Sequence, residues 1–178
     1  MKVCRKEGFM RNLYIDFDGV ILDTIPPLYK ALDEAGIDKE NQKEVQKYFS
    51  TFDFKEILTD ENIINDGINA IRELNTCGKF NVSILTHINS LQEGIDKTKY
   101  IRRHLRDVTM ILVPKSIAKT QMVHTKDAIL VDDYPGNLEE WESKGGIGVK
   151  FTDNLKTKDF YRINNLRSLI ELFGSDDK

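Results

Sequence analysis

The sequence predicts an α/β fold built around a parallel sheet of five strands, and two observations lead to this prediction. Short apolar runs rich in Val, Ile and Leu recur along the chain without polar alternation, as is typical of strands buried on both faces. Segments with the apolar spacing of helices lie between these runs, and such alternation indicates a parallel sheet with right-handed crossovers. The length of 178 residues suits one domain with an insertion.

The expected elements of this core are spread over the chain. The strands are "NLYID" (12–16), "NVSIL" (81–85), "VTMILV" (108–113), "AILVDD" (128–133) and "IGVKF" (147–151). Helices are expected between or after them, at 63–74, 89–106, 137–143 and 166–173. The first helix has apolar residues at spacings of three and four, which place them on one face. The last stops at Gly174, a residue type that commonly ends helices.

Residues 25–60 interrupt the alternation, because no strand pattern occurs there. Two consecutive prolines open the segment, a helix ended by a glycine is expected at 28–36, and a second helix is expected at 39–49. We expect this segment to form a small helical cap over the carboxyl end of the sheet. The α/β core would then consist of residues 1–24 and 61–178.

Composition and charge argue against several classes of protein. The formal net charge of −3 gives no reason to expect nucleic-acid binding, which usually shows a basic patch. No apolar run approaches the roughly 18 residues that span a bilayer, so no membrane partner is expected. The basic start lacks the hydrophobic segment of a secretory signal, and Cys4 and Cys77 lack metal or disulfide spacing. We expect a cytoplasmic protein with reduced cysteines. A plain alternative for the beginning of the chain is that Met10 is the working start and residues 1–9 are a loose extension.

Polar residues suited to phosphate or metal chemistry follow four of the expected strands. Ligands of open α/β sheets bind beyond the carboxyl ends of the strands, so these positions are candidates for a functional site. In chain order they are Asp16 and Asp18, Thr86 and His87, Lys115 and Lys119, and Asp132 and Asp133. This coincidence is the strongest functional signal in the sequence.

The spacing of Asp16 and Asp18 places both side chains on the same side of an extended segment. Gly19 allows the backbone to turn sharply and to bring amide N–H groups toward an anion. If the first and fourth strands are neighbours, four carboxylates meet and cannot all ionise without a nearby cation. Hard oxygen ligands without a histidine cluster favour Mg²⁺ over zinc or copper. Neutralising Asp132 or Asp133 is therefore expected to stabilise the ion-free protein.

Four motifs occur in order: DxDGV at Asp16, a threonine after an apolar strand, a lysine, and "VDDYPGN" ending at Asn137. In this order they resemble the motifs of the haloacid dehalogenase (HAD) superfamily of phosphatases. The resemblance implies a Rossmann-like three-layer sandwich over nearly the whole chain beyond Met10, with a five-stranded parallel sheet and a cap inserted after the first strand. Two stretches resemble the 5′(3′)-deoxyribonucleotidase-like branch more closely: "IINDGINAIRELN" and "ILVDDYPGNLEEWESKGGIGVKF".

The resemblance also implies roles in a phosphatase reaction. Asp16 would attack phosphorus to form an aspartyl-phosphate, and Asp18 would protonate the leaving alcohol and then deprotonate water. Thr86 and Lys119 would bind the phosphoryl oxygens, with Lys115 as the reserve candidate for the lysine.

The same resemblance implies a site for Mg²⁺. The ion would be held by Asp16, by the backbone carbonyl of Asp18 and by Asp133, with Asp132 in support. Asp132 and Asp133 could instead form a turn before Pro135, which is the plainer interpretation of an acidic pair at that place.

Other candidate residues also have plainer interpretations. Thr86 could cap the helix that follows, and Lys119 could be a solvated lysine. His87 stands where nucleotidases of this kind more often carry a small polar residue, and it could bind substrate or make local hydrogen bonds. Phe52 and Phe54 could stack on a nucleobase or could pack the cap.

We expect a Mg²⁺-dependent phosphomonoesterase acting on a nucleoside monophosphate or a similar small phosphate ester. A sugar-phosphate phosphatase or a phosphotransferase of the same superfamily is the alternative. A receiver-like signalling module is less favoured, because its acidic pair comes first in the chain and a second carboxylate beside the phosphoacceptor promotes hydrolysis. The expected partner is a small phosphorylated substrate, and a homodimer is left open because a compact cap leaves the site accessible.

Overall fold

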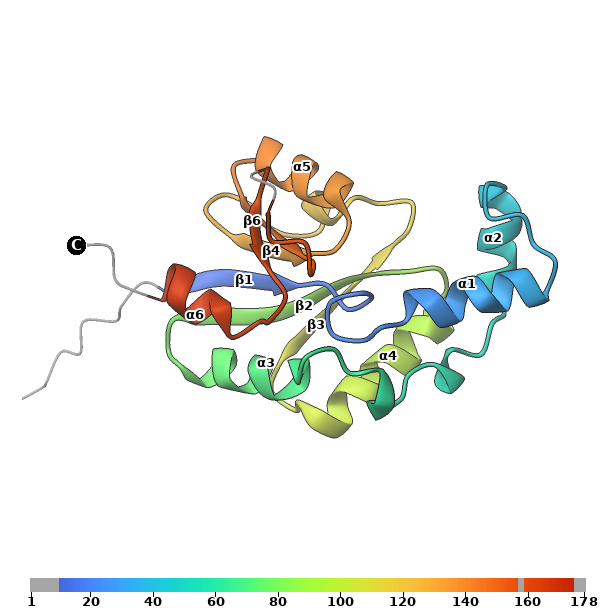
Figure 1. Ribbon diagram of the computed structural model, residues 1–178, viewed down its shortest axis with the longest axis horizontal. Helices are drawn as coiled ribbons and strands as arrows, with labels where there is room; N and C mark the ends of the chain where they lie inside the picture. Colours follow the sequence, from blue (N-terminus) through green and yellow to red (C-terminus); the bar gives the residue numbers. More distant parts are fainter. Residues whose placement is uncertain (1–9, 157–158, 175–178) are drawn as a thin grey trace, which may run out of the picture.

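The structure, a computed structural model, describes residues 10–156 and 159–174. Its centre is a six-stranded sheet with the strand order β3-β2-β1-β4-β5-β6 (Figure 1). The strands are β1 (Arg11–Ile15), β2 (Phe80–Ile88), β3 (Thr109–Pro114), β4 (Ile129–Asp132), β5 (Ile147–Phe151) and β6 (Tyr161–Ile163). All neighbouring pairs are parallel, as expected. Residues 1–9, which include Cys4 and form the alternative extension, lie outside the described residues.

The prediction of five strands is wrong, because β6 continues the sheet beside β5. The pairing runs from Val149 opposite Tyr161 to Phe151 opposite Ile163. β6 is three residues long, lies at the edge of the sheet and begins with Tyr161, which is 54% exposed. A short edge strand of this kind lacks the continuous apolar run that marks strands buried on both faces.

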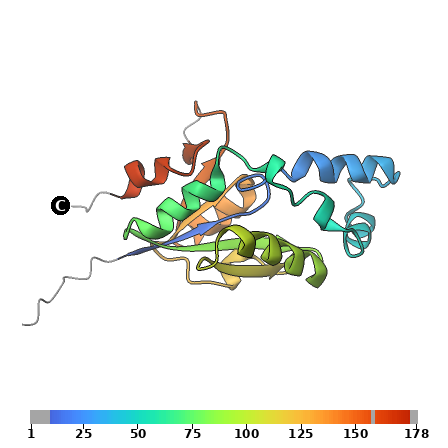
Figure 2. The ribbon, with the colours of Figure 1, turned by 90° about the horizontal axis from the view of Figure 1, so that it is seen from below.

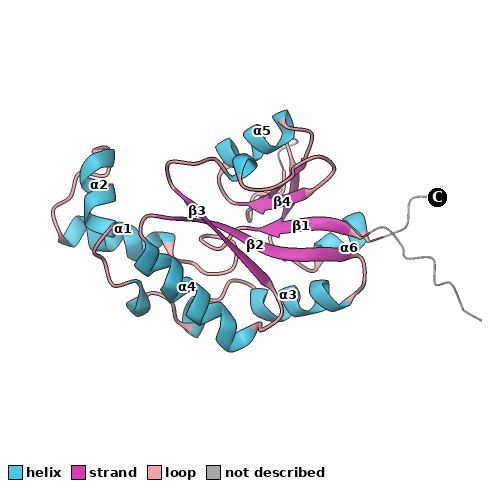
Figure 3. Ribbon diagram, turned by 180° about the vertical axis from the view of Figure 1, so that it is seen from behind, coloured by secondary structure: helices cyan, strands magenta, loops and turns pink. Residues whose placement is uncertain are grey.

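Helices cover both faces of the sheet. One face lies under α3 (Gly67–Thr76), α4 (Leu91–His104) and α6 (Ser168–Phe173), and the other lies under α5 (Pro135–Ser143) (Figures 1 and 3). Side chains alternate between the faces: Leu13 and Ile15 belong to the larger buried cluster, whereas Tyr14 packs edge to face on Trp141 of α5. No helix in the described part of the chain is long and apolar enough to cross a membrane.

Two further helices, α1 (Ile25–Glu34) and α2 (Gln42–Phe49), lie between β1 and α3 in the sequence. They project beyond the end of the sheet toward which β1 runs (Figures 1 and 2). Two prolines occupy the first turn of α1. N–H groups in the first turn have no acceptor within the helix, so their absence in proline costs no hydrogen bond. Asn41 caps α2 by accepting a hydrogen bond from the amide of Glu44. The inward-facing residues Leu32 and Phe49 join the larger core cluster.

The register of the central strands determines where the following loops emerge. Ile15 at the end of β1 lies opposite Val131 of β4 on one side and Ile84 of β2 on the other. β1 ends at Ile15 and β4 ends at Asp132, whereas β2 continues to Ile88. The segments that follow β1 and β4 therefore leave the sheet side by side, at the carboxyl ends of the parallel strands. The candidate side chains on three separate parts of the chain are brought together in this way.

Candidate active site

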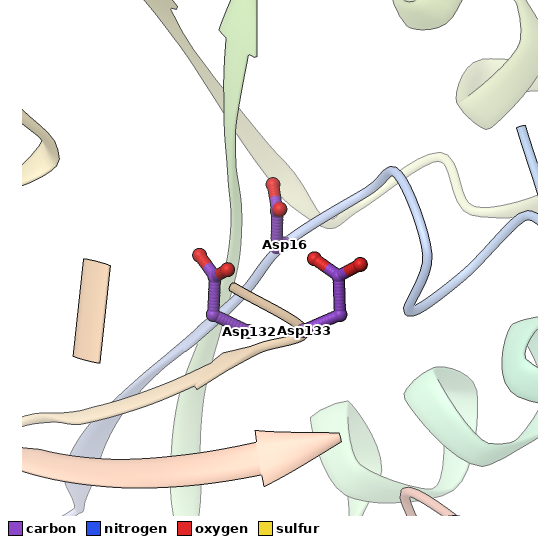
Figure 4. Close-up of side chains that lie close together, drawn as sticks. All are labelled: Asp16, Asp132 and Asp133. Atoms are coloured by element: carbon purple, nitrogen blue, oxygen red, sulfur yellow. The ribbon is translucent and has the colours of Figure 1, made fainter. Parts of the chain in front are cut away.

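Three carboxylates meet at the carboxyl ends of β1 and β4. We call Asp16, Asp132 and Asp133 the acidic cluster, because each offers an oxygen within 4.8 Å of the others. Figure 4 shows their carboxyl groups on the same side of the two chain segments that carry them. Three of the four carboxylates expected at one place thus form the cluster. Asp18 lies outside it and contacts a different cation.

Lys119 is paired with two members of the acidic cluster. It begins the short helix η3 (Lys119–Gln121), is buried, and places its Nζ 2.8 Å from Asp16 Oδ1 and 2.6 Å from Asp132 Oδ2. The reserve candidate Lys115 is exposed. Asp132 is also bound by the Asn137 side chain and by the amide of Tyr134, each at 2.9 Å. The turn before Pro135 and the contact to lysine therefore occur together.

Asp16 is buried, and its negative charge is only partly compensated by its neighbours. Its Oδ1 lies near Lys119 but has no hydrogen bond of good geometry from the described residues. Burial raises its pKa to about 7, with Lys119 opposing the rise and Asp132 and Asp18 adding to it. Burial, followed by the charge of Asp132, likewise raises the pKa of Asp133 to about 6.

These features fit a divalent cation. The cluster consists of hard oxygen donors, it contains a buried oxygen without a hydrogen-bond partner, and it holds more negative charge than Lys119 balances. Carboxylate oxygens of this kind are the ligands that Mg²⁺ prefers in proteins.

Gly19 makes room for one member of the cluster. It has φ +71°, and a Cβ at this position would lie 2.3 Å from Asp133 Oδ2. The expected sharp turn is present, and the amide of Gly19 is used within it, donating to the carbonyl of Leu22 at 2.8 Å. Glycine is therefore required both for the backbone conformation and for the approach of Asp133.

Two hydrogen-bond donors outside the acidic cluster hold the carboxylate of Asp18. Thr24 Oγ1 donates to its Oδ1 at 2.7 Å, and Lys97 Nζ donates to its Oδ2 at 2.6 Å. Burial alone would raise the pKa of Asp18, but Lys97 and Thr24 outweigh burial and lower the pKa below its ordinary value. Asp16 and Asp18 therefore have opposite shifts, although one residue separates them.

Lys97 was not predicted from the sequence. It lies in the charged stretch "QEGIDKTKY" of α4, where a lysine is usually solvated. Two signals could have identified it: Glu93 precedes it by four residues, and it shares the helix face of the buried residues Tyr100 and Ile101.

Thr86 and His87 lie inside β2, which continues to Ile88. Thr86 is fully buried, its Oγ1 donates to the carbonyl of His87 at 3.2 Å, and Lys97 Nζ lies 3.4 Å from the same hydroxyl. His87 Nε2 lies 3.1 Å from the carbonyl oxygen of Ile117, and burial lowers its pKa. His87 therefore makes the local contact expected under the plainer interpretation.

The two phenylalanines pack within the segment between β1 and α3. Phe54 is buried, and its ring lies 5.1 Å from that of Phe52 and 6.1 Å from that of Phe49. Phe52 is partly buried and lines a cavity of about 440 Å³ together with Pro27 and Tyr48. The structure does not bring either ring among the residues of the acidic cluster.

No protein-family model matches the chain, and no curated protein sequence matches it at a significant level. Solved structures match over most of its length. A HAD-superfamily hydrolase of subfamily IA from Geobacter sulfurreducens is 15% identical, with a TM-score of 0.60 over 92% of this chain and 100% of that one. A HAD-hydrolase from Bacillus subtilis bound to magnesium is 13% identical, with a TM-score of 0.59 over 93% and 99%. The D,D-heptose 1,7-bisphosphate phosphatase of Burkholderia thailandensis is 16% identical, with a TM-score of 0.52 over 93% and 99%.

These similar structures define the class of fold. They are HAD-superfamily hydrolases and phosphatases, and a dehalogenase with a TM-score of 0.57 is also among them. The chain therefore has the α/β, Rossmann-like fold of the HAD-superfamily hydrolases, with a parallel sheet of six strands. At 10–16% identity the likeness establishes the fold, and the chemistry has to be argued from the side chains.

Proposed function

We propose that the protein is a Mg²⁺-dependent phosphomonoesterase of the HAD superfamily that works through an aspartyl-phosphate on Asp16. The observation that carries this proposal is the meeting of Asp16, Asp132 and Asp133 at the carboxyl ends of the strands, where Lys119 pairs with the first two. A phosphatase and a magnesium-bound hydrolase among the structures of similar fold support it.

The acidic cluster would hold the ion. Asp16, Asp133 and the backbone carbonyl of Asp18 are the proposed ligands, and Asp132 supports them because Lys119 and other donors already engage its carboxylate. Mg²⁺ bound there would neutralise negative charge on the phosphoryl oxygens and on the cluster.

The protein's own residues would perform the group transfer. An Asp16 carboxylate oxygen attacks phosphorus, and the bond from phosphorus to the leaving oxygen breaks. Asp18, which this step requires in its protonated form in the substrate complex although Lys97 and Thr24 lower its pKa in the free protein, gives its proton to the leaving alcohol. Asp18 then takes a proton from water, whose oxygen attacks phosphorus and releases phosphate and the Asp16 carboxylate. Lys119 and the hydroxyl of Thr86 bind the phosphoryl oxygens, whose charge grows as the reaction proceeds.

Dehalogenation is the other reaction found among the structures of similar fold. A halide leaves without a proton and the substrate carries no phosphoryl charge, so that reaction needs neither a general acid at the leaving group nor a cation beside it. The presence of Asp18 beside Asp16, and of Asp132 and Asp133 opposite it, therefore favours a phosphate ester, whose leaving oxygen needs a proton and whose charge needs a cation.

We propose residues 25–60 as the cap and the remainder of the chain as the core. The expected substrate is a nucleoside monophosphate or a similar small phosphate ester, as in the 5′(3′)-deoxyribonucleotidase-like branch. A sugar-phosphate phosphatase or a phosphotransferase is the alternative, and the heptose bisphosphate phosphatase of similar fold supports it. Cytoplasmic location and a cap completed by a second subunit remain proposals of the same kind.

Steady-state assays test the function. The purified protein should release phosphate from 4-nitrophenyl phosphate and from some members of a panel of nucleoside monophosphates and sugar phosphates, with Mg²⁺ but not with EDTA. Asp16→Asn should abolish this activity and leave the fold intact, as shown by an unchanged circular dichroism spectrum. The matched control Asp23→Asn changes an exposed carboxylate of the same loop and should be fully active. Turnover retained by Asp16→Asn would remove the nucleophile assignment.

A further inference from the structure

Helix α4 carries a fully buried lysine that the proposed chemistry does not use. The Lys97 side chain is 1% exposed, and its Nζ lies 2.6 Å from Asp18 Oδ2 and 2.7 Å from Glu93 Oε1. Burying an ammonium group is costly unless it is paired and hydrogen-bonded. A sequence that needed only packing here would be served by an apolar residue, so the charge calls for a functional reason.

The position of Lys97 excludes direct contact with a substrate. An ammonium group has three N–H donors, and those of Lys97 already face Asp18 Oδ2 at 2.6 Å, Glu93 Oε1 at 2.7 Å and the carbonyl of His87 at 3.2 Å. Lys97 can therefore act on a ligand only through the groups in front of it. These groups are Asp18 and the hydroxyl of Thr86, which lies 3.4 Å from Nζ.

Lys97 is itself held in place from behind. Glu93 is buried, and its Oε2 accepts hydrogen bonds from the amide of Asn89 at 2.6 Å and from the Asn89 side chain at 3.0 Å. The carbonyl of His87 accepts from Nζ at 3.2 Å, and the ring of Phe17 lies below the ammonium group at 5.2 Å. Together these contacts fix the ammonium group of Lys97 in one position.

The two oxygens of Asp18 have different fixed donors. Thr24 binds Oδ1 and Lys97 binds Oδ2, so the plane of the carboxyl group is set by the protein before any substrate arrives. General acid–base catalysis requires such placement, because a proton moves only over hydrogen-bonding distance. Asp16, which acts as the nucleophile, has its own lysine and makes no use of Lys97.

We propose that Lys97, anchored by Glu93, is a positioning residue that aligns Asp18 for proton transfer to the leaving alcohol and from the attacking water. This inference rests on the proposed function and adds to it a second buried lysine with a separate task. Lys97 keeps its own proton throughout. The proton of the reaction passes only between Asp18 and the leaving or attacking oxygen.

The inference predicts a dependence on the leaving group. An alkyl alkoxide must be protonated as it departs, whereas nitrophenolate departs without a proton. Loss of alignment at Asp18 should therefore reduce kcat/KM for an alkyl phosphate far more than for 4-nitrophenyl phosphate. Since acid–base catalysis contributes about 100-fold or more, we expect the two losses to differ by a factor of about 100.

The test compares Lys97→Met with the parent and with Lys99→Met, which changes an exposed lysine on the same helix. The substrates are 4-nitrophenyl phosphate and β-glycerol phosphate, assayed with Mg²⁺. Lys97→Met should also show a rapid burst of nitrophenolate of one equivalent per site before slow turnover, because water attack on the aspartyl-phosphate needs Asp18 as base. Lys99→Met should behave as the parent does.

The outcomes separate the two proposals. A parent that hydrolyses neither ester contradicts the proposed function, and this inference falls with it. An active parent with Lys97→Met equally impaired on both esters, or unimpaired, overturns the inference and leaves the function standing. If Lys97→Met does not fold, Glu93→Gln decides: it keeps the Lys97–Asp18 pair but weakens its anchor, and it should show the same leaving-group pattern to a smaller extent.

Discussion

Asp133 carries a negative charge that the ion-free protein tolerates poorly. Burial and the neighbouring charge of Asp132 raise its pKa to about 6, and Lys150 reduces this rise without cancelling it. A carboxyl group whose pKa is higher in the folded than in the unfolded protein binds its proton more tightly when folded. Its contribution to stability is therefore lost as the pH rises, between about pH 4 and the folded pKa of about 6.

Asp133→Asn removes this charge and should stabilise the ion-free protein. A rise in pKa from 3.8 to about 6 corresponds to about 3 kcal/mol above both values, because one pKa unit equals about 1.4 kcal/mol. At pH 8 the gain should approach this value, which is a rise in Tm of about 6–12 °C for a chain of this length. At pH 5 about half of the gain should remain, because the Asp133 carboxyl group of the folded parent is already mostly protonated there.

Thermal unfolding in EDTA at pH 5 and pH 8, followed by circular dichroism, measures this gain. The control Asp23→Asn changes an exposed carboxylate and should leave Tm within about 2 °C of the parent. Millimolar Mg²⁺ should raise Tm for the parent and much less for Asp133→Asn, because the variant lacks one proposed ligand. A variant that is less stable than the parent at pH 8, or a gain that is larger at pH 5, would refute the electrostatic reasoning.

The structure separates Asp133 from Asp132, although the sequence alone leads to the same expectation for both. Asp132 Oδ2 accepts from Lys119 and Asn137, and its Oδ1 accepts from the amide of Tyr134. Its neutralisation would leave Lys119 less well compensated, so Asp132→Asn should destabilise the ion-free protein. The stability changes expected for Asp132→Asn and Asp133→Asn thus have opposite signs, and measuring both tests the geometry of the cluster.

Three further predictions concern packing and charge, and denaturant unfolding in EDTA at pH 7.5 measures each. Gly19→Ala should lower the free energy of unfolding by clearly more than the control Gly36→Ala. Both glycines have positive φ, so both substitutions carry a backbone cost of roughly 1–2 kcal/mol, but only Gly19 faces Asp133. Equal losses would contradict the close approach of Asp133 to Gly19. Lys119→Met should cost about 3–5 kcal/mol, because it leaves two buried carboxylates without their cation, and a loss below about 1 kcal/mol would count against the pairing. Phe54→Ala should cost about 3–5 kcal/mol as a core truncation, and a change within about 0.5 kcal/mol would show that the ring is not packed as described.

The sequence predicts the position of the acidic cluster because local and global signals agree there. The apolar runs before Asp16 and Asp132 identify buried parallel strands, and such strands align their carboxyl ends at one edge. The same reasoning places Lys119 near that edge, although the choice against Lys115 depends on the chain path after β3. The sequence could not show which oxygens the lysine would reach.

The features that sequence reasoning missed depend on tertiary context. Lys97 reads as a solvated helical lysine, and its burial follows from pairing with Asp18, which lies 79 residues away in the chain. β6 has only one buried residue, Ile163, so no pattern distinguishes it from a loop. In both cases the decisive partner is distant in sequence, and periodicity within a short window carries no information about it.

Chemical capture of the aspartyl-phosphate tests the central claim most directly. Borohydride reduces an acyl phosphate to an alcohol, so the parent, reacted with 4-nitrophenyl phosphate and Mg²⁺ and then treated with borohydride, should carry homoserine at position 16 in peptide mass spectra. Samples without substrate or with EDTA should be unmodified. Active hydrolysis with an unmodified Asp16, or reduction at another carboxylate, would contradict the nucleophile and the site built around it.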